Sequence, residues 1–176
     1  MGKLVDIKTY AADKAITRAQ TQWQTRFPET LRADTRLKDL SDPTLLTLAH
    51  LGDEVMRVLH DLVMGVLGLG PGMKFDYLSG DPKLKILDIT LFVIDQIRWE
   101  CMSRLDWIHG FPAEVYPVVD LIMNCERIKA EFEPAFPQIC PSHPDYEEFM
   151  RRRDADGETM VRFMIPSALT AFAQKI

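Results

Sequence analysis

The chain has 176 residues, of which 47% are hydrophobic and 27% charged, and its formal net charge is -5 at pH 7. This composition is typical of a packed globular protein, and the length predicts one helical domain over residues 1–176. The acidic balance disfavours nucleic acid as a partner, because a protein that binds a phosphate backbone needs clustered lysine and arginine.

The sequence also carries expectations about location. No run reaches the roughly 18 uninterrupted apolar residues of a membrane span, and residues 1–10 lack the apolar region of a secretory signal peptide. Three cysteines, at positions 101, 125 and 140, are an odd number, which favours buried thiols in a reducing compartment over a disulfide framework. We therefore expect a cytoplasmic protein that does not bind a membrane.

Residues 1–40 are more polar than the rest and are predicted to form an N-terminal arm, while residues 41–176 form the helical bundle. Within the arm, apolar residues at helical spacing predict a helix over about 11–27, which Pro28 ends. We expect the arm to wrap around the outside of the bundle or to contact a neighbouring molecule.

A strong helix is predicted over about 44–67, because Ser41-Asp42-Pro43 is a helix start in which Asp42 caps the free amides. Its residues separate into an apolar half and a polar half that includes His50 and Glu54. The polar half is interpreted as a solvated face and not as a metal site. Di-iron bundles use an inward Glu-x-x-His pair, and here the third position after the glutamate is Arg57.

A glycine-rich stop at 68–72 ends this helix. It is not a phosphate-binding loop, because it follows a helix, contains a proline and lacks the Gly-Lys-Ser/Thr ending. The connection after it carries four large side chains, which we expect to pack on the bundle. They are Met73, Phe75, Tyr77 and Leu78.

The stretch from Leu84 to His109 is the longest apolar run with helical spacing, and it predicts a central helix that opens at Asp81-Pro82. One broad side of this helix is apolar and is assigned to the core. The opposite side is expected to face water. It carries Lys85, Gln96, Glu100 and Ser103.

Three further segments follow the central helix. A helix is predicted over 117–132, and the prolines of 134–144 predict a non-helical crossing. A short helix over about 145–153 and a last helix over about 160–172, bent or divided by a proline, complete the chain. The predicted fold is therefore all-α, an irregular antiparallel bundle of five to six helices around the central helix 84–109.

A mixed stripe of acids and large apolar groups lies between the two sides of the central helix and is the nearest approach to a functional site. In one interpretation Phe92, Trp99 and Met102 pack into the core, with the acids at its wet margin. In a second they form a surface for a protein partner. In a third, Asp95 and Asp120 line a small-molecule pocket and share a proton or bind a cation. The candidate site residues are Phe92, Asp95, Trp99, Met102 and Asp120.

Cys140-Pro-Ser-His143 has the spacing of half a zinc site, but a structural zinc site needs four ligands. Only Cys101, Cys125 and His109 remain to complete it, and all lie within or at the ends of predicted helices. We therefore expect an ordinary loop cysteine beside a loop histidine. Nothing in the sequence places a base beside any thiol, which argues against cysteine nucleophile chemistry.

These patterns contain no recognisable catalytic residue, metal site or cofactor motif. We therefore predict a non-enzymatic interaction or regulatory module that binds a protein partner or a second copy of itself. The alternative is a small-molecule-binding protein or enzyme with a pocket that uses Asp95 and Asp120.

Overall fold

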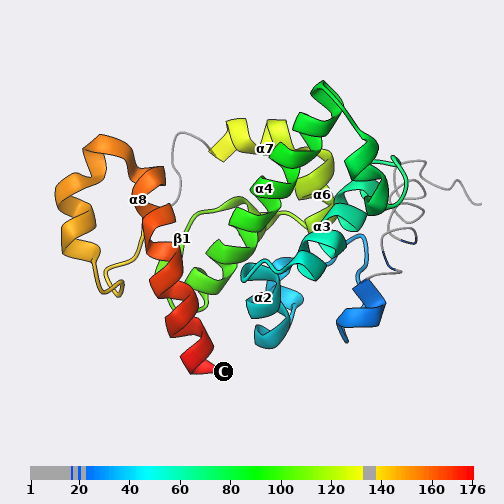
Figure 1. Ribbon diagram of the computed structural model, residues 1–176. Coiled ribbons are helices and arrows are strands. Elements are labelled where there is room, and N and C mark those ends of the chain that lie inside the picture. The colour runs from blue at the N-terminus through cyan, green and yellow to red at the C-terminus, as the bar shows by residue number, and fades with distance from the viewer. Residues whose placement is uncertain (1–16, 18–19, 21–22, 133–137) are drawn as a thin grey trace, which may run out of the picture.

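The computed structural model describes residues 17, 20, 23–132 and 138–176, and for 152–160 it describes the backbone alone. The all-α class is confirmed, because helices account for nearly all regular structure in these residues (Figure 1). Residues 23–26 are helical. The elements after them are η1 (Leu37–Asp39), α2 (Asp42–Ala49), α3 (Asp53–Val66), η2 (Gly72–Tyr77), α4 (Asp81–Ser103), β1 (Ile108–His109), α5 (Pro112–Val115), α6 (Val118–Met123), α7 (Cys125–Phe132), β2 (Gln138–Ile139) and α8 (Tyr146–Lys175).

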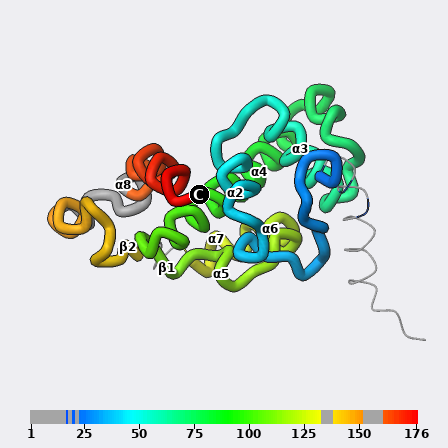
Figure 2. Tube along the Cα trace, turned by 90° about the horizontal axis from the view of Figure 1, so that it is seen from below, coloured from blue at the N-terminus to red at the C-terminus, as the bar shows by residue number. Residues whose placement is uncertain are grey.

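The predicted central helix is α4, which contacts α2, α3, α5, α6 and α8. In Figure 2, α8 lies on one side of the molecule and α5, α6 and α7 lie on the other. One hydrophobic core runs through these contacts and includes residues from Trp23 to Phe172. No helix in the described ranges is long and apolar enough to cross a membrane. The antiparallel bundle arrangement itself stays a prediction.

Both predicted Asp-Pro helix starts are confirmed, because α2 begins at Asp42 and α4 at Asp81. Proline fits the first helical turn, where its missing amide hydrogen removes no helical hydrogen bond. The capping residue differs from the prediction. The Ser41 side chain, and not that of Asp42, accepts a hydrogen bond from the backbone N–H of Thr44.

Most of the helices are shorter than predicted, and they are more numerous than the five or six expected. The predicted helix 44–67 is split into α2 and α3 at Leu51, whose φ of 49° ends the first helix before Gly52. Similarly, α4 ends at Ser103 and not at 109, since Asp106 has a φ of 59° and the chain reverses there. A positive φ is unfavourable for residues with a Cβ atom, so neither residue type signals a helix end. The apolar spacing of the sequence does not change at these positions either, and it gave no indication of the breaks.

The predictions for the end of the chain are also corrected. The helix predicted over 117–132 is divided into α6 and α7 at Asn124. The two helices predicted after 144 are one continuous helix, α8, with Pro166 inside it. Between α7 and α8, the strand Gln138–Ile139 pairs antiparallel with Ile108–His109. The predicted non-helical crossing therefore contains a short strand.

The predicted wet side of α4 is wet only in part. Lys85 is exposed, but Gln96 and Glu100 are buried. The Gln96 side-chain oxygen accepts a hydrogen bond of 3.1 Å from the N–H of Ala113, which places α5 over this part of α4. A polar side chain can be buried against a neighbouring helix when that helix supplies its hydrogen-bond partner, as Ala113 does for Gln96.

Most of the predicted helix 11–27 lies outside the described residues. The part that is described packs inward: the Trp23 and Phe27 rings lie 4.8 Å apart, and both are buried. Leu31, Leu37 and Leu40 are buried as well. The prediction that this arm wraps around the outside is wrong for residues 23–40, because their apolar side chains belong to the core.

Candidate functional site

The apolar members of the mixed stripe lie inside the chain. Phe92, Trp99 and Met102 are all buried. The Lys129 ammonium of α7 covers the Phe92 ring at 5.4 Å, and the Trp99 ring meets Phe111 edge-on at 6.4 Å. In this conformation the three side chains cannot form a surface for another molecule, because neighbouring helices already cover them.

The two aspartates of the predicted pocket have different surroundings. The Asp95 carboxylate, with 13% of its side chain exposed, forms an ion pair of 2.9 Å with Arg162 of α8. Asp120 is half-buried on α6, and its charge acts on Arg127 of α7. Asp95 therefore connects α4 to α8, whereas Asp120 lies beside α7. These contacts give no support to a shared cavity.

Residues 69–84, called the connection below, join α3 to α4 and include the first turn of α4, and they are held firmly on their inner side. The Phe75 ring stacks on His60 of α3, with centroids 4.2 Å apart, and the Lys83 ammonium lies 4.9 Å from the same ring. The Gly72 N–H donates to the Asp61 carboxylate. A Cβ atom at position 72 would lie 2.5 Å from the backbone nitrogen of Asp61, so only glycine allows this close approach.

On its outer side the same connection presents large side chains to solvent. Met73 is 76% exposed and Tyr77 is 88% exposed, while Phe75 and Leu78 pack inward. The prediction that all four side chains pack on the bundle is thus right for two of them. Ten large hydrophobic side chains are exposed among the described residues, and four belong to this connection: Leu69, Met73, Tyr77 and Leu84.

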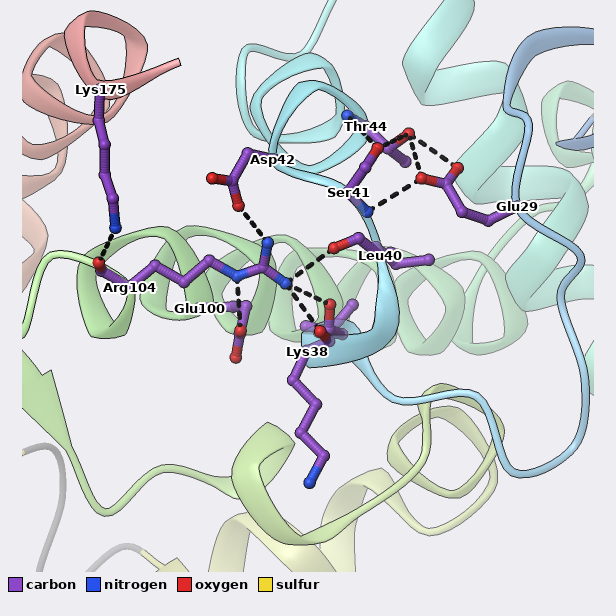
Figure 3. A network of polar contacts seen from close by, with 10 residues as sticks. Glu29, Lys38, Leu40, Ser41, Asp42, Thr44, Glu100, Arg104 and Lys175 are labelled. Carbon is purple, nitrogen blue, oxygen red and sulfur yellow. Dashed lines mark hydrogen bonds and ion pairs between the residues drawn. The ribbon is translucent and has the colours of Figure 1, made fainter.

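A polar network surrounds Arg104, just after α4 (Figure 3). Its guanidinium donates to the carboxylates of Glu100 and Asp42. It also donates to three backbone carbonyls before α2, those of Leu37, Lys38 and Leu40, at 2.9–3.2 Å. Burial alone would lower the pKa of Arg104, but the hydrogen bonds to the two carboxylates outweigh burial and raise it. The group stays charged and connects α4 to α2, so we assign the network to folding.

A second part of this network caps α2. The Glu29 carboxylate accepts hydrogen bonds from the Ser41 N–H at 2.9 Å and from the Thr44 hydroxyl at 2.9 and 3.0 Å (Figure 3). Burial acts to raise the pKa of Glu29, but these hydrogen bonds favour the charged form, and the net pKa is lowered from 4.5. Glu29 therefore stabilises the folded state only when it is ionised.

Glu29→Gln should destabilise the protein by about 1 kcal/mol at neutral pH, which is the usual net contribution of one hydrogen bond to the free energy of unfolding. The loss should be fully present above the unfolded-state pKa of 4.5 and should shrink as the pH falls through the lower folded-state pKa. Urea unfolding of both proteins from pH 7 to pH 3 measures this difference. A difference that grows on acidification would contradict the assignment.

The strands β1 and β2 lie side by side (Figure 2), and their pairing brings a thiol and an imidazole together. The Cys140 N–H donates to the Trp107 carbonyl at 2.8 Å, and the strand pair sets Ile108 opposite Ile139. As a result, His109 Nδ1 lies 3.3 Å from Cys140 Sγ. No base could be placed beside a thiol from the sequence, because Cys140 and His109 are 31 residues apart and meet only through the strands.

The charges around this pair are unfavourable for a thiolate. Burial raises the pKa of Cys140, and the carboxylates of Asp106 and Glu114 raise it further. The other two cysteines are buried, with pKa values raised by burial to about 12 for Cys101 and about 11 for Cys125. All three thiols are therefore protonated at neutral pH, which argues against a nucleophilic cysteine.

His143 is not part of this pair, although the sequence placed it beside Cys140. It is buried, its Nδ1 accepts a hydrogen bond of 2.9 Å from the Asp145 N–H, and its ring meets Trp107 edge-on at 4.5 Å. Burial lowers its pKa, against the nearby Asp145 charge, so the ring is neutral at pH 7. Across the ranges that the structure describes, no three metal-ligating side chains gather at one point.

No protein-family model matches this sequence, and comparisons with curated proteins and with solved structures found no match. The function therefore has to be argued from the surfaces and contacts of this chain alone.

Proposed function

We propose that the chain is a non-enzymatic interaction module that self-associates through the connection 69–84. The observation that carries the proposal is the pair Met73 and Tyr77, which are 76% and 88% exposed on a segment whose inner side is anchored. Tyrosine and methionine are enriched in interface cores. A segment that is already ordered loses little entropy on binding, so its exposed side chains favour association.

A second copy of the chain is the occupant that the local charges favour. The whole chain has a net charge of -5, but the connection holds two lysines and two aspartates and is neutral. In a two-fold symmetric interface each patch meets its own copy. Lys74 and Lys83 of one copy can then lie opposite Asp76 and Asp81 of the other, which removes the repulsion expected between two acidic molecules.

The cellular location is part of the proposal. The structure has three free cysteines, two of them buried. A protein with such thiols and no disulfide suits a reducing compartment, and we infer the cytoplasm. The alternative enzyme or small-molecule-binding function has no observation in its favour at Asp95 or Asp120, and we do not propose it.

The double variant Met73→Glu/Tyr77→Glu should be a folded monomer under conditions where the wild type is a dimer. Two interface anchors are worth at least about 2 kcal/mol each, so the dissociation constant should rise roughly 700-fold or more. Light scattering in the presence of a chelator gives the mass, and circular dichroism checks folding.

Phe163→Glu is the matched control, because Phe163 is 80% exposed on α8, away from the connection. This variant should keep the wild-type mass. If it dissociates the dimer and the double variant does not, another surface is used and the proposal fails.

A further inference from the structure

The Cys140–His109 pair has the geometry of two ligands of a tetrahedral zinc ion. In such a site Zn–S is about 2.3 Å and Zn–N about 2.0 Å, which puts sulfur and nitrogen roughly 3.5 Å apart at the tetrahedral angle. The observed distance from Cys140 Sγ to His109 Nδ1 is 3.3 Å. The two atoms are therefore about as far apart as two ligands of one ion, and a bound metal would replace their present contact.

The surroundings favour a cation over nucleophilic chemistry. Asp106 and Glu114 oppose a thiolate in the metal-free protein. When a divalent cation binds, the same two carboxylates become favourable, because they add negative potential around the ion. Binding of the Cys140 sulfur to the metal releases the thiol proton to solvent, and the His109 ring binds the metal through a nitrogen lone pair.

One copy of the chain cannot complete this site. Structural zinc needs four protein ligands, and catalytic zinc needs three. In the described part of the chain, no third cysteine, histidine or carboxylate joins the pair within reach of one ion. The pair is nevertheless open to another molecule, because His109 is exposed and the neighbouring Gln138, Pro141 and Ser142 are exposed too.

We propose that Cys140 and His109 form half of a zinc site that the same two residues of a second copy complete. The resulting Cys2His2 set is tetrahedral, lies on a two-fold axis, and binds one zinc ion per two chains with release of two protons. It is a different contact from the connection 69–84: the two lie at opposite ends of α4, whose 23 residues span about 35 Å.

The test uses the Met73→Glu/Tyr77→Glu variant, so that dimerisation by zinc is read separately from association through the connection. Zinc is titrated into metal-free protein while mass is followed by light scattering. The mass should double and saturate at one zinc per two chains. Cobalt in place of zinc should give the thiolate-to-metal absorption and the visible bands of a tetrahedral site.

Cys140→Ser and His109→Ala should each abolish the mass increase, with folding checked by circular dichroism. His50→Ala, at an exposed histidine on another part of the surface, should dimerise like its parent. A mass that stays at one chain, a stoichiometry of one zinc per chain, or zinc-driven dimerisation that survives His109→Ala would overturn the proposal. None of these outcomes affects the proposed function, whose test is made with a chelator present.

Discussion

Arg104→Ala should destabilise the protein by about 3–5 kcal/mol, which lowers Tm by roughly 6–20 °C for a chain of this size. The Arg104 side chain is only 18% exposed and the Glu100 side chain only 7%. Removal of the guanidinium leaves the Glu100 carboxylate buried without its cation, and it leaves the carbonyls of Leu37, Lys38 and Leu40 without this donor. Thermal unfolding followed by circular dichroism measures the loss.

Two further variants separate the geometry of Arg104 from its charge. Arg104→Lys keeps the charge but has no planar fork to reach carboxylates and carbonyls together, so its stability should lie between wild type and alanine. Arg151→Ala removes a surface pair with Glu148, in which the arginine side chain is 70% exposed, and should cost about 0–1 kcal/mol. Equal losses at positions 104 and 151 would refute a structural role for the network.

Phe92→Ala together with Trp99→Ala should prevent stable folding. Each truncation of a buried aromatic side chain costs about 3–5 kcal/mol, and the sum approaches the whole stability of an ordinary domain. Both residues are buried on α4, under Lys129 and against Phe111 respectively. The expected result is loss of the cooperative unfolding transition in urea.

Leu91→Ala is the control for this pair, because Leu91 is on the same helix but 58% exposed. Its effect should stay within about 0.5 kcal/mol of wild type. A folded double variant with a lower solution mass would instead show that the stripe is an interface, and it would contradict the burial described above.

The helical class and the starts of α2 and α4 could be predicted from the sequence, because they depend on residues that are neighbours in the chain. The Asp-Pro pairs at 42–43 and 81–82 lie in the first turns of α2 and α4, where proline is favoured by its own backbone geometry. The breaks at Leu51 and Asp106 could not be predicted, since both residues adopt positive φ values that only the surrounding structure stabilises. The helical spacing of apolar residues continues across both breaks, so the sequence pattern predicts one uninterrupted helix in each case.

The candidate surfaces were harder to predict than the fold. Whether Met73 and Tyr77 pack or project depends on how η2 docks on α3, which the sequence does not encode locally. Cys140 and His109 are 31 residues apart and meet only because two dipeptides pair as strands. Spacing instead pointed to His143, whose ring is buried against Trp107.

The most direct test of self-association is sedimentation equilibrium of the wild type, in chelator, across the micromolar range. We expect a reversible shift with concentration from one chain of 20.2 kDa to twice that mass. The same series on Met73→Glu/Tyr77→Glu should stay at one chain. A wild-type mass of one chain at every concentration would contradict self-association through residues 69–84.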